Sequence, residues 1–199
     1  MKITTLFCDV GGVLLTNGWG HQSRKLAAEK FGYDLAEAET RHHLMFDDFE
    51  EGKISLHDYL RFTIFNQPCS FSEEDYVAFM YAQSQPLQPM LDYVKELKRK
   101  HALKVVLVSN EGRELTNYRI EKFGLKEVAD IFVVSSFVGV RKPGKAIFRL
   151  ALDLAQERPE QVIYLDDRPL FVEIAQSLGI PALRHVDRPT TEAELKKML

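Results

Sequence analysis

The chain has 199 residues, which suits one core domain with an insertion better than two full domains. Hydrophobic residues make up 45% of the chain, enough to bury a core, and charged residues make up 28%. The formal net charge of −3, without a basic stripe, argues against a nucleic-acid partner and against an anionic-membrane surface.

Two other features bear on where the protein works. No apolar run approaches the roughly 20 residues that a membrane span needs, and the N-terminal sequence lacks the basic-then-apolar pattern of a signal peptide. The two cysteines, Cys8 and Cys69, form no disulfide framework. We therefore expect a cytoplasmic protein without a membrane partner.

The first predicted strand begins near residue 3 and ends abruptly at one carboxylate, Asp9. Gly11 and Gly12 follow, and glycines allow a sharp turn and a close approach of the backbone to a ligand. In open α/β sheets, ligands bind just beyond the carboxyl ends of the strands. The pattern therefore predicts that Asp9 points into a ligand-binding cleft.

The character of the sequence changes after this first strand. From about residue 21 to residue 81, apolar residues recur at helical spacing and no β-branched run occurs, which predicts four or five short helices. Ser55 and Ser72, each followed by acidic residues, are typical of helix starts. We expect residues 16–86 to form an all-helical insertion.

From residue 86 onward, apolar strands alternate with helices. This alternation is typical of βαβ units and predicts a doubly wound, Rossmann-like parallel sheet in an α/β fold, built from residues 1–15 and 87–199. The near-continuous apolar strands agree with burial on both faces of the sheet. The expected strands cover residues 104–108, 131–134, 161–165 and 181–184, and the expected helices cover residues 89–100, 113–123, 145–155 and 169–178, with a last helix at the C-terminus.

Polar residues follow several of the expected strands. Because parallel strands point the same way, these residues should meet at one edge of the sheet, and a loop residue after another strand can reach the same edge. Three carboxylates in one cleft repel each other unless a hard cation such as Mg²⁺ lies among them. A carboxylate can also attack phosphorus and form an aspartyl phosphate. The residues concerned are Asp9, Ser109, Asn110, Lys142, Asp166 and Asp167.

Four motifs in this order resemble those of the haloacid dehalogenase-like superfamily, whose members are mostly phosphatases. They lie at residues 7–14, 108–110, 142–143 and 164–167. The resemblance covers the expected core and implies that the helical insertion is the cap, which closes over the cleft and selects the substrate. It implies a phosphatase that acts on a small phosphorylated metabolite, such as a sugar phosphate.

The resemblance also implies roles for individual residues. Asp9 would be both the nucleophile and a Mg²⁺ ligand, with the backbone carbonyl of Gly11 as a second ligand. Asp167 would touch the metal, and Asp166 would hold a metal-bound water. The residues implied to bind the phosphoryl group are Ser109, Asn110 and Lys142, of which Lys142 would also neutralise the nucleophile.

Two positions depart from the family pattern. Most phosphatases of this type carry a second Asp two residues after the nucleophile, which protonates the leaving oxygen and then activates water. This chain has Gly11 there, although general acid–base catalysis typically contributes about 10²–10⁴-fold to the rate. Phe171 replaces the Asn or Asp that usually steadies the last motif, which bears on the positioning of Asp167.

The missing acid leaves three alternatives open. The enzyme could prefer substrates whose leaving oxygen needs little protonation, such as sugar-1-phosphates. The cap could supply the acid, or the protein could bind a phosphorylated ligand for regulation without turnover. A dehalogenase fits less well, because the pair at residues 166–167 would then have no purpose. The candidate cap residues are His42, His43, Asp47, Asp48 and Glu50, and each could instead belong to a solvated helix face.

Two further expectations concern aromatic and imidazole side chains. Trp19, at the start of the crossing into the cap, either lines the substrate pocket or packs in the core or hinge. His57, His101 and His185 have no partner pattern, so we expect them at the surface.

Overall fold

The centre of the fold is a five-stranded parallel sheet, seen in a computed structural model that describes residues 2–199. The strand order is β3-β2-β1-β4-β5, so β1 is the middle strand. The predicted α/β class and parallel sheet are therefore confirmed. The strands are β1 (Thr5–Cys8), β2 (Lys104–Ser109), β3 (Ile131–Val134), β4 (Val162–Asp166) and β5 (Ala182–Arg184).

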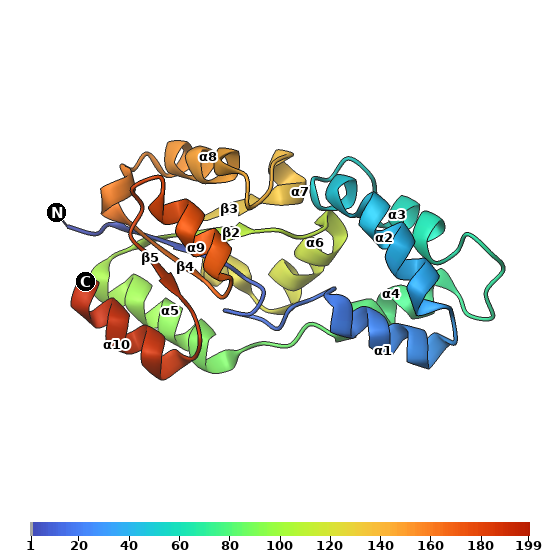
Figure 1. Ribbon diagram of the computed structural model, residues 1–199. Helices are drawn as coiled ribbons and strands as arrows, with labels where there is room; N and C mark the ends of the chain where they lie inside the picture. Colours follow the sequence, from blue (N-terminus) through green and yellow to red (C-terminus); the bar gives the residue numbers. More distant parts are fainter. Residues whose placement is uncertain (1) are drawn as a thin grey trace.

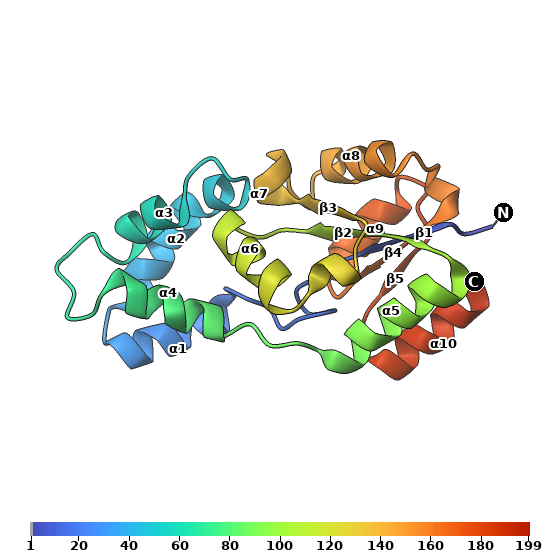
Figure 2. The same cartoon turned by 180° about the vertical axis from the view of Figure 1, so that it is seen from behind.

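Helices cover both faces of the sheet, as expected for strands that are apolar on both sides. Within β1, Leu6 and Cys8 belong to one buried cluster and Phe7 belongs to the other. The Leu6 face packs against helices on one side of the sheet, and the Phe7 face packs against helices on the other (Figures 1 and 2). The first group is α5 (Gln88–His101), α6 (Arg113–Lys122) and α10 (Arg188–Met198), and the second is α8 (Lys145–Ala155) and α9 (Pro169–Gln176).

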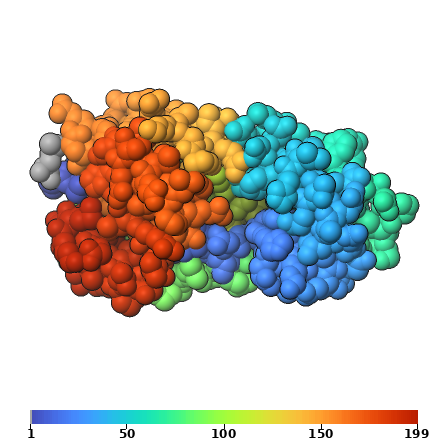
Figure 3. Space-filling view, in the orientation of Figure 1, coloured from blue at the N-terminus to red at the C-terminus, as the bar shows by residue number. Residues whose placement is uncertain are grey.

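An all-helical segment is inserted between β1 and β2, as predicted. It lies beyond one end of the sheet, opposite the chain termini (Figure 1), and abuts the core in the space-filling view (Figure 3). Ser55 and Ser72 are the N-caps of α3 and α4, and each accepts a backbone hydrogen bond, which confirms both predicted helix starts. One helix, α2, has 16 residues and is longer than expected. The helices are α1 (His21–Phe31), α2 (Leu35–Glu50), α3 (Leu56–Thr63) and α4 (Glu73–Ala82).

The inserted segment has an aromatic core of its own. Tyr76 is fully buried at its centre, with the rings of Phe31 and Trp19 at 5.2 and 5.7 Å between centroids. The Tyr76 hydroxyl lies 2.9 Å from the hydroxyl of Tyr33, so its polar atom is satisfied inside the cluster. Burial of large aromatic side chains supplies most of the stabilisation available to so small a unit.

The chain enters and leaves the insertion through two paired segments. Thr16 N donates to Gln85 O at 2.8 Å, and Leu87 N donates to Leu14 O at 2.9 Å. Thr16 Oγ1 also donates to Gln83 O at 2.8 Å. The predicted boundaries at residues 15–16 and 86–87 fall within this pair, and the division into two domains there stays a prediction.

Three local features differ from the sequence predictions. The fourth strand runs one residue further than expected, so Asp166 belongs to β4. A short helix, α7 (Ser135–Val138), follows β3 and was not predicted. His185 is buried, with Nδ1 2.8 Å from Thr191 Oγ1, so the predicted surface position was wrong. The partner Thr191 lies on the C-terminal helix, and nothing in the local pattern around His185 reveals it.

Among residues 2–199, no helix is both long enough and apolar enough to span a membrane.

The aromatic core of the insertion gives a testable prediction. Replacing Tyr76 by Ala should lower the free energy of unfolding by about 3–5 kcal/mol, as for other large-to-small core changes. Tyr76→Phe keeps the ring and removes only the contact with Tyr33, so it should cost about 1 kcal/mol. Urea denaturation followed by circular dichroism measures both, and equal effects of the two changes would contradict this packing.

Candidate active site

Asp9 follows the last residue of β1 and is held at the carboxyl end of the sheet. Its backbone N–H donates to Leu165 O at 2.9 Å, which continues the pairing with β4. Its side chain is buried, and Oδ1 accepts a hydrogen bond from Val10 N at 2.7 Å. Within residues 2–199, Oδ2 receives no hydrogen bond or ion pair. One carboxylate oxygen is therefore fixed and the other is available.

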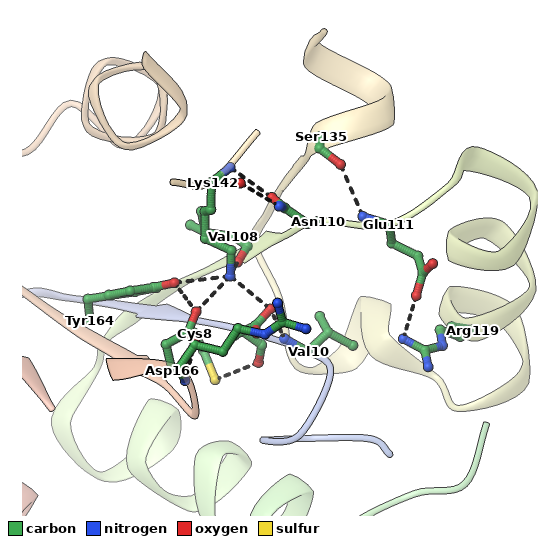
Figure 4. A network of polar contacts seen from close by, with 12 residues as sticks. Cys8, Val10, Val108, Asn110, Glu111, Arg119, Ser135, Lys142, Tyr164 and Asp166 are labelled. Atoms are coloured by element: carbon green, nitrogen blue, oxygen red, sulfur yellow. Dashed lines mark hydrogen bonds and ion pairs between the residues drawn. The ribbon is translucent and has the colours of Figure 1, made fainter. Parts of the chain in front are cut away.

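Lys142 is 1% exposed, and its ammonium group pairs with two buried carboxylates. Its Nζ lies 3.1 Å from Asp9 Oδ1. The same Nζ lies 2.7 Å from Asp166 Oδ2 (Figure 4). Nζ also donates to Val108 O and to the Tyr164 hydroxyl, both at 3.0 Å. A buried ammonium group is tolerated only when it is paired in this way.

Asp166 is completely buried, and both of its carboxylate oxygens are engaged. Oδ2 accepts hydrogen bonds from Lys142 Nζ and from the Tyr164 hydroxyl, and Oδ1 accepts one from Arg168 N at 2.8 Å. These three hydrogen bonds fix the orientation of the carboxylate. Asp166 therefore holds the ammonium group in place beside Asp9.

Asp167 differs from its neighbour, because its Oδ1 is buried without a hydrogen-bond partner in the described structure. Carboxylate oxygens of Asp9, Asp166 and Asp167 all lie within 4.8 Å of one another. Three carboxylates against one ammonium leave two net negative charges, which one divalent cation would balance. Oxygen donors of this kind suit Mg²⁺, and the unpartnered oxygen supplies a free ligand atom, so the site fits that metal.

Gly12 allows the β1 turn to approach Asp167. Its φ is +76°, and a Cβ built there would lie 2.4 Å from Asp167 Oδ2. Any side chain at this position would therefore strain the backbone and collide with the carboxylate.

The electrostatics of the cluster follow from its burial. Burial raises the pKa of Asp9 to about 6, and the neighbouring Lys142 ammonium opposes that rise. Burial also raises the pKa of Asp167, with the charge of Asp166 adding to the effect. A cation among these carboxylates would favour their ionised forms.

Ser109 and Asn110 lie at the end of β2, where the sequence placed them. Ser109 is buried, and both residues line the cavity above Asp9. The Asn110 side chain forms two hydrogen bonds with the backbone of Lys142 (Figure 4). Its Nδ2 donates to Lys142 O at 2.7 Å, and Lys142 N donates to its Oδ1 at 2.9 Å. Asn110 therefore positions Lys142, and the predicted phosphate-binding role of both residues stays a prediction.

A cavity of about 520 Å³ separates the sheet edge from the inserted helices. Asp9, Gly11 and Lys142 line it from the core, and Trp19 and Glu50 line it from the insertion. Trp19 also packs against Tyr76, which confirms the predicted core packing, while its predicted role in a substrate pocket stays a prediction. This volume suits a small molecule.

The cap residues considered as acids are all on α2, but they face different surroundings. Asp47 and Asp48 have side chains 75% and 52% exposed and do not line the cavity. His42 lines it, but its Nδ1 bonds to the Tyr59 hydroxyl at 2.7 Å, and burial lowers its pKa to about 4. His43 is exposed, and Glu50 is mostly buried against the cavity.

Sequence reasoning missed several contacts of the site. The Tyr164 hydroxyl contacts both Lys142 and Asp166. Tyr164 lies in the motif at residues 164–167, but no role was predicted for it from the sequence. Phe171, noted only as a departure from the family pattern, places its ring centroid 4.9 Å from Lys142 Nζ as a cation–π partner. The alternation of strand residues could have placed Tyr164 two positions before Asp166, on the same face.

Comparison with known protein families matches residues 3–179 to the haloacid dehalogenase-like hydrolases. The chain belongs to this family. The match covers the whole helical insertion and all four motif regions of this hydrolase, and it confirms the family that the motifs indicated.

Solved structures agree on the fold. A HAD family enzyme from Bacteroides thetaiotaomicron is 20% identical, with a TM-score of 0.82 over 94% of this chain and 95% of that chain. A complex of the wild-type Bacteroides protein with magnesium and inorganic phosphate has a TM-score of 0.81.

Curated relatives match over shorter stretches. Acyl-CoA dehydrogenase family member 10 of Mus musculus is 39% identical over 71 residues, which is 35% of this chain and 6% of that protein. The pyrimidine 5′-nucleotidase YjjG of Escherichia coli is 34% identical over 79 residues, which is 39% of this chain and 35% of the nucleotidase. The hydrolase thus spans less than half the length of each of these relatives.

The close approach at Gly12 gives a second prediction. Gly12→Ala should lose Mg²⁺ affinity at least tenfold, because the methyl group displaces Asp167. Gly139→Ala is the matched control, because Gly139 has φ +71° with nothing within 4 Å of its Cβ position. Both changes should lower stability by about 1–2 kcal/mol, the cost of a left-handed alanine. Calorimetric Mg²⁺ titration separates them, and equal affinity in the two variants would contradict the role given to Gly12.

Proposed function

We propose that this hydrolase is a Mg²⁺-dependent phosphatase that acts on a small phosphorylated metabolite. The observation that carries the proposal is the Asp9 carboxylate, one oxygen of which is tied to Lys142 and Val10 while the other faces no partner among residues 2–199. An oriented and partly neutralised carboxylate of this kind suits nucleophilic attack on phosphorus. We further propose residues 1–15 and 87–199 as the catalytic core and residues 16–86 as the cap.

The proposed reaction has two steps. Asp9 attacks phosphorus, the bond to the leaving oxygen breaks, and an aspartyl phosphate forms; water then attacks phosphorus and releases Asp9 and inorganic phosphate. Lys142 would balance charge on Asp9 and on the phosphoryl oxygens, while Ser109 would bind the phosphoryl group. Asn110 contributes to phosphate binding chiefly by fixing Lys142 through its backbone.

We assign the metal to Asp9, Asp167 and the backbone carbonyl of Gly11, with Asp166 acting through a water. When bound, Mg²⁺ would draw charge from the phosphoryl oxygens and orient them toward Asp9. The unpartnered Oδ1 of Asp167 supports this assignment. The Bacteroides protein of the same fold, whose complex contains magnesium and inorganic phosphate, supports it further.

The substrate class rests on the cavity and on the curated relatives. A cavity of about 520 Å³ between core and cap holds a metabolite rather than a polymer. The Escherichia coli relative is a nucleotidase, which also removes phosphate from a small molecule.

The alternative function is that of a phospho-ligand-binding or weakly active protein. Gly11 favours it, because the usual proton donor is absent from that position. A ligand-binding protein, however, has no need of an oriented nucleophile such as Asp9.

A screen tests the proposal. The protein should release phosphate from at least one small phosphorylated metabolite in Mg²⁺, and chelation of the metal should abolish the release. Asp9→Asn should lower kcat by 10³-fold or more, because an amide is a poor nucleophile. Folding of the variant is checked by its melting temperature. Phosphate release that survives Asp9→Asn, or no release from any substrate, would refute the proposal.

A further inference from the structure

The position of Gly11 leaves the proposed reaction without its usual proton donor. A Cβ built on Gly11 would lie 3.0 Å from Asn17 Oδ1, so the Asn17 amide occupies the space that a side chain at residue 11 would enter. An amide does not transfer protons at neutral pH. If the leaving oxygen is protonated by the protein, another group lining the cavity must do it.

Most titratable groups lining the cavity are committed to other contacts. Glu111 pairs with Arg119 at 2.9 Å and also accepts a hydrogen bond from Gly112 N. His42 is tied to Tyr59 and is neutral, as described above. His21 lies 3.2 Å from Glu39, and His43 Nδ1 lies 2.6 Å from Glu39 O. His42 and Glu111 are thus held by neighbouring groups, while His21 and His43 are exposed side chains at the cavity.

Glu50 is the exception among the described groups. Its side chain is 12% exposed and lines the same cavity as Asp9 and Gly11. Its Oε2 lies 2.8 Å from Arg141 Nη2 but receives no hydrogen bond of suitable geometry. Arg141 precedes Lys142 and also pairs with Asp47, so it keeps one carboxylate partner when Glu50 is protonated.

We propose that Glu50, carried by the cap helix α2, is the general acid and base that replaces the missing side chain at Gly11. The inference rests on the proposed phosphatase function and assigns a catalytic residue within it. It selects the alternative in which the cap supplies the acid.

The proton balance closes with Glu50 in this role. When Asp9 attacks phosphorus, the electron pair of the breaking P–O bond goes to the leaving oxygen, which takes the Glu50 proton and departs as an alcohol. In the second step Glu50 accepts a proton from the attacking water, and the bond between phosphorus and Asp9 breaks. Inorganic phosphate, Asp9 carboxylate and protonated Glu50 result, so the cycle repeats.

The charges around Glu50 suit a group that changes protonation near neutrality. Burial raises its pKa to about 7, and Glu111 adds to the rise. Three cations lower the pKa of Glu50, and Arg141 has the largest effect, followed by Arg168 and then Lys142. Since the acid must be protonated for the first step, kcat/KM for a substrate with a poor leaving group should fall as the pH rises above about 7.

The test uses three probes of similar size whose leaving groups run from good to poor: 4-nitrophenyl, phenyl and benzyl phosphate. Glu50→Gln should lower kcat/KM for benzyl phosphate by about 10²-fold or more, the usual contribution of a general acid. It should change kcat/KM for 4-nitrophenyl phosphate less than threefold, because that leaving group needs no proton. The fall above pH 7 with benzyl phosphate should disappear.

Asp47→Asn is the matched control, because Asp47 lies on the same helix and pairs with the same arginine outside the cavity. It should leave the ratio of the rates for the three probes unchanged, and Glu50→Asp should recover part of the benzyl phosphate rate. An equal loss on all probes in Glu50→Gln, or the same selectivity change in Asp47→Asn, would overturn the role of Glu50 alone. A wild type that hydrolyses none of the probes or metabolites in Mg²⁺ would overturn the phosphatase function as well.

Discussion

The structure depends on one buried interaction, the contact of the Lys142 ammonium with the carboxylates of Asp9 and Asp166. Without this cation, three carboxylates would crowd one end of the sheet with no charge to balance them. Asn110, which follows β2, and Tyr164 of β4 hold Lys142, so the ammonium group is fixed before any ligand arrives. The three carboxylates and the one ammonium group leave two net negative charges, so the site suits a divalent cation.

The cap is coupled to this cluster through neighbouring residues. Arg141 reaches α2, while the next residue, Lys142, reaches Asp9. Arg119, which also lines the cavity, donates to Thr16 O and to Ser84 Oγ. Thr16 and Ser84 lie in the two segments that lead into and out of the insertion. Both sets of contacts tie the cap to the core, and the pairing of Arg141 with Glu50 holds α2 beside the cavity that Asp9 lines. A proton donor on the cap is therefore a consistent substitute for one on the β1 turn.

Much of this arrangement is encoded locally. Apolar runs mark the strands, Ser55 and Ser72 mark helix starts, and parallel strands carry Asp9 and residues 166–167 to one edge. The cap contacts are not encoded in this way. Helical periodicity in the sequence predicts that Glu50 lies on a helix. Only the packing of α2 against the loop that carries Arg141 determines that Glu50, and not Asp47 three residues earlier, lines the cavity. The hydrogen bonds between the Asn110 side chain and the Lys142 backbone likewise join segments 32 residues apart. No spacing pattern in the sequence predicts them.

The central claim is that Asp9 carries the phosphoryl group during turnover, and the most direct measurement is mass spectrometry of acid-quenched protein. The enzyme is mixed with a substrate in Mg²⁺, quenched during the first turnovers and digested at low pH. The peptide containing Asp9 should gain the mass of one phosphoryl group, and omitting Mg²⁺ should remove this gain. Turnover with no modified Asp9 at any quench time, or a phosphoryl group on another residue, would contradict it.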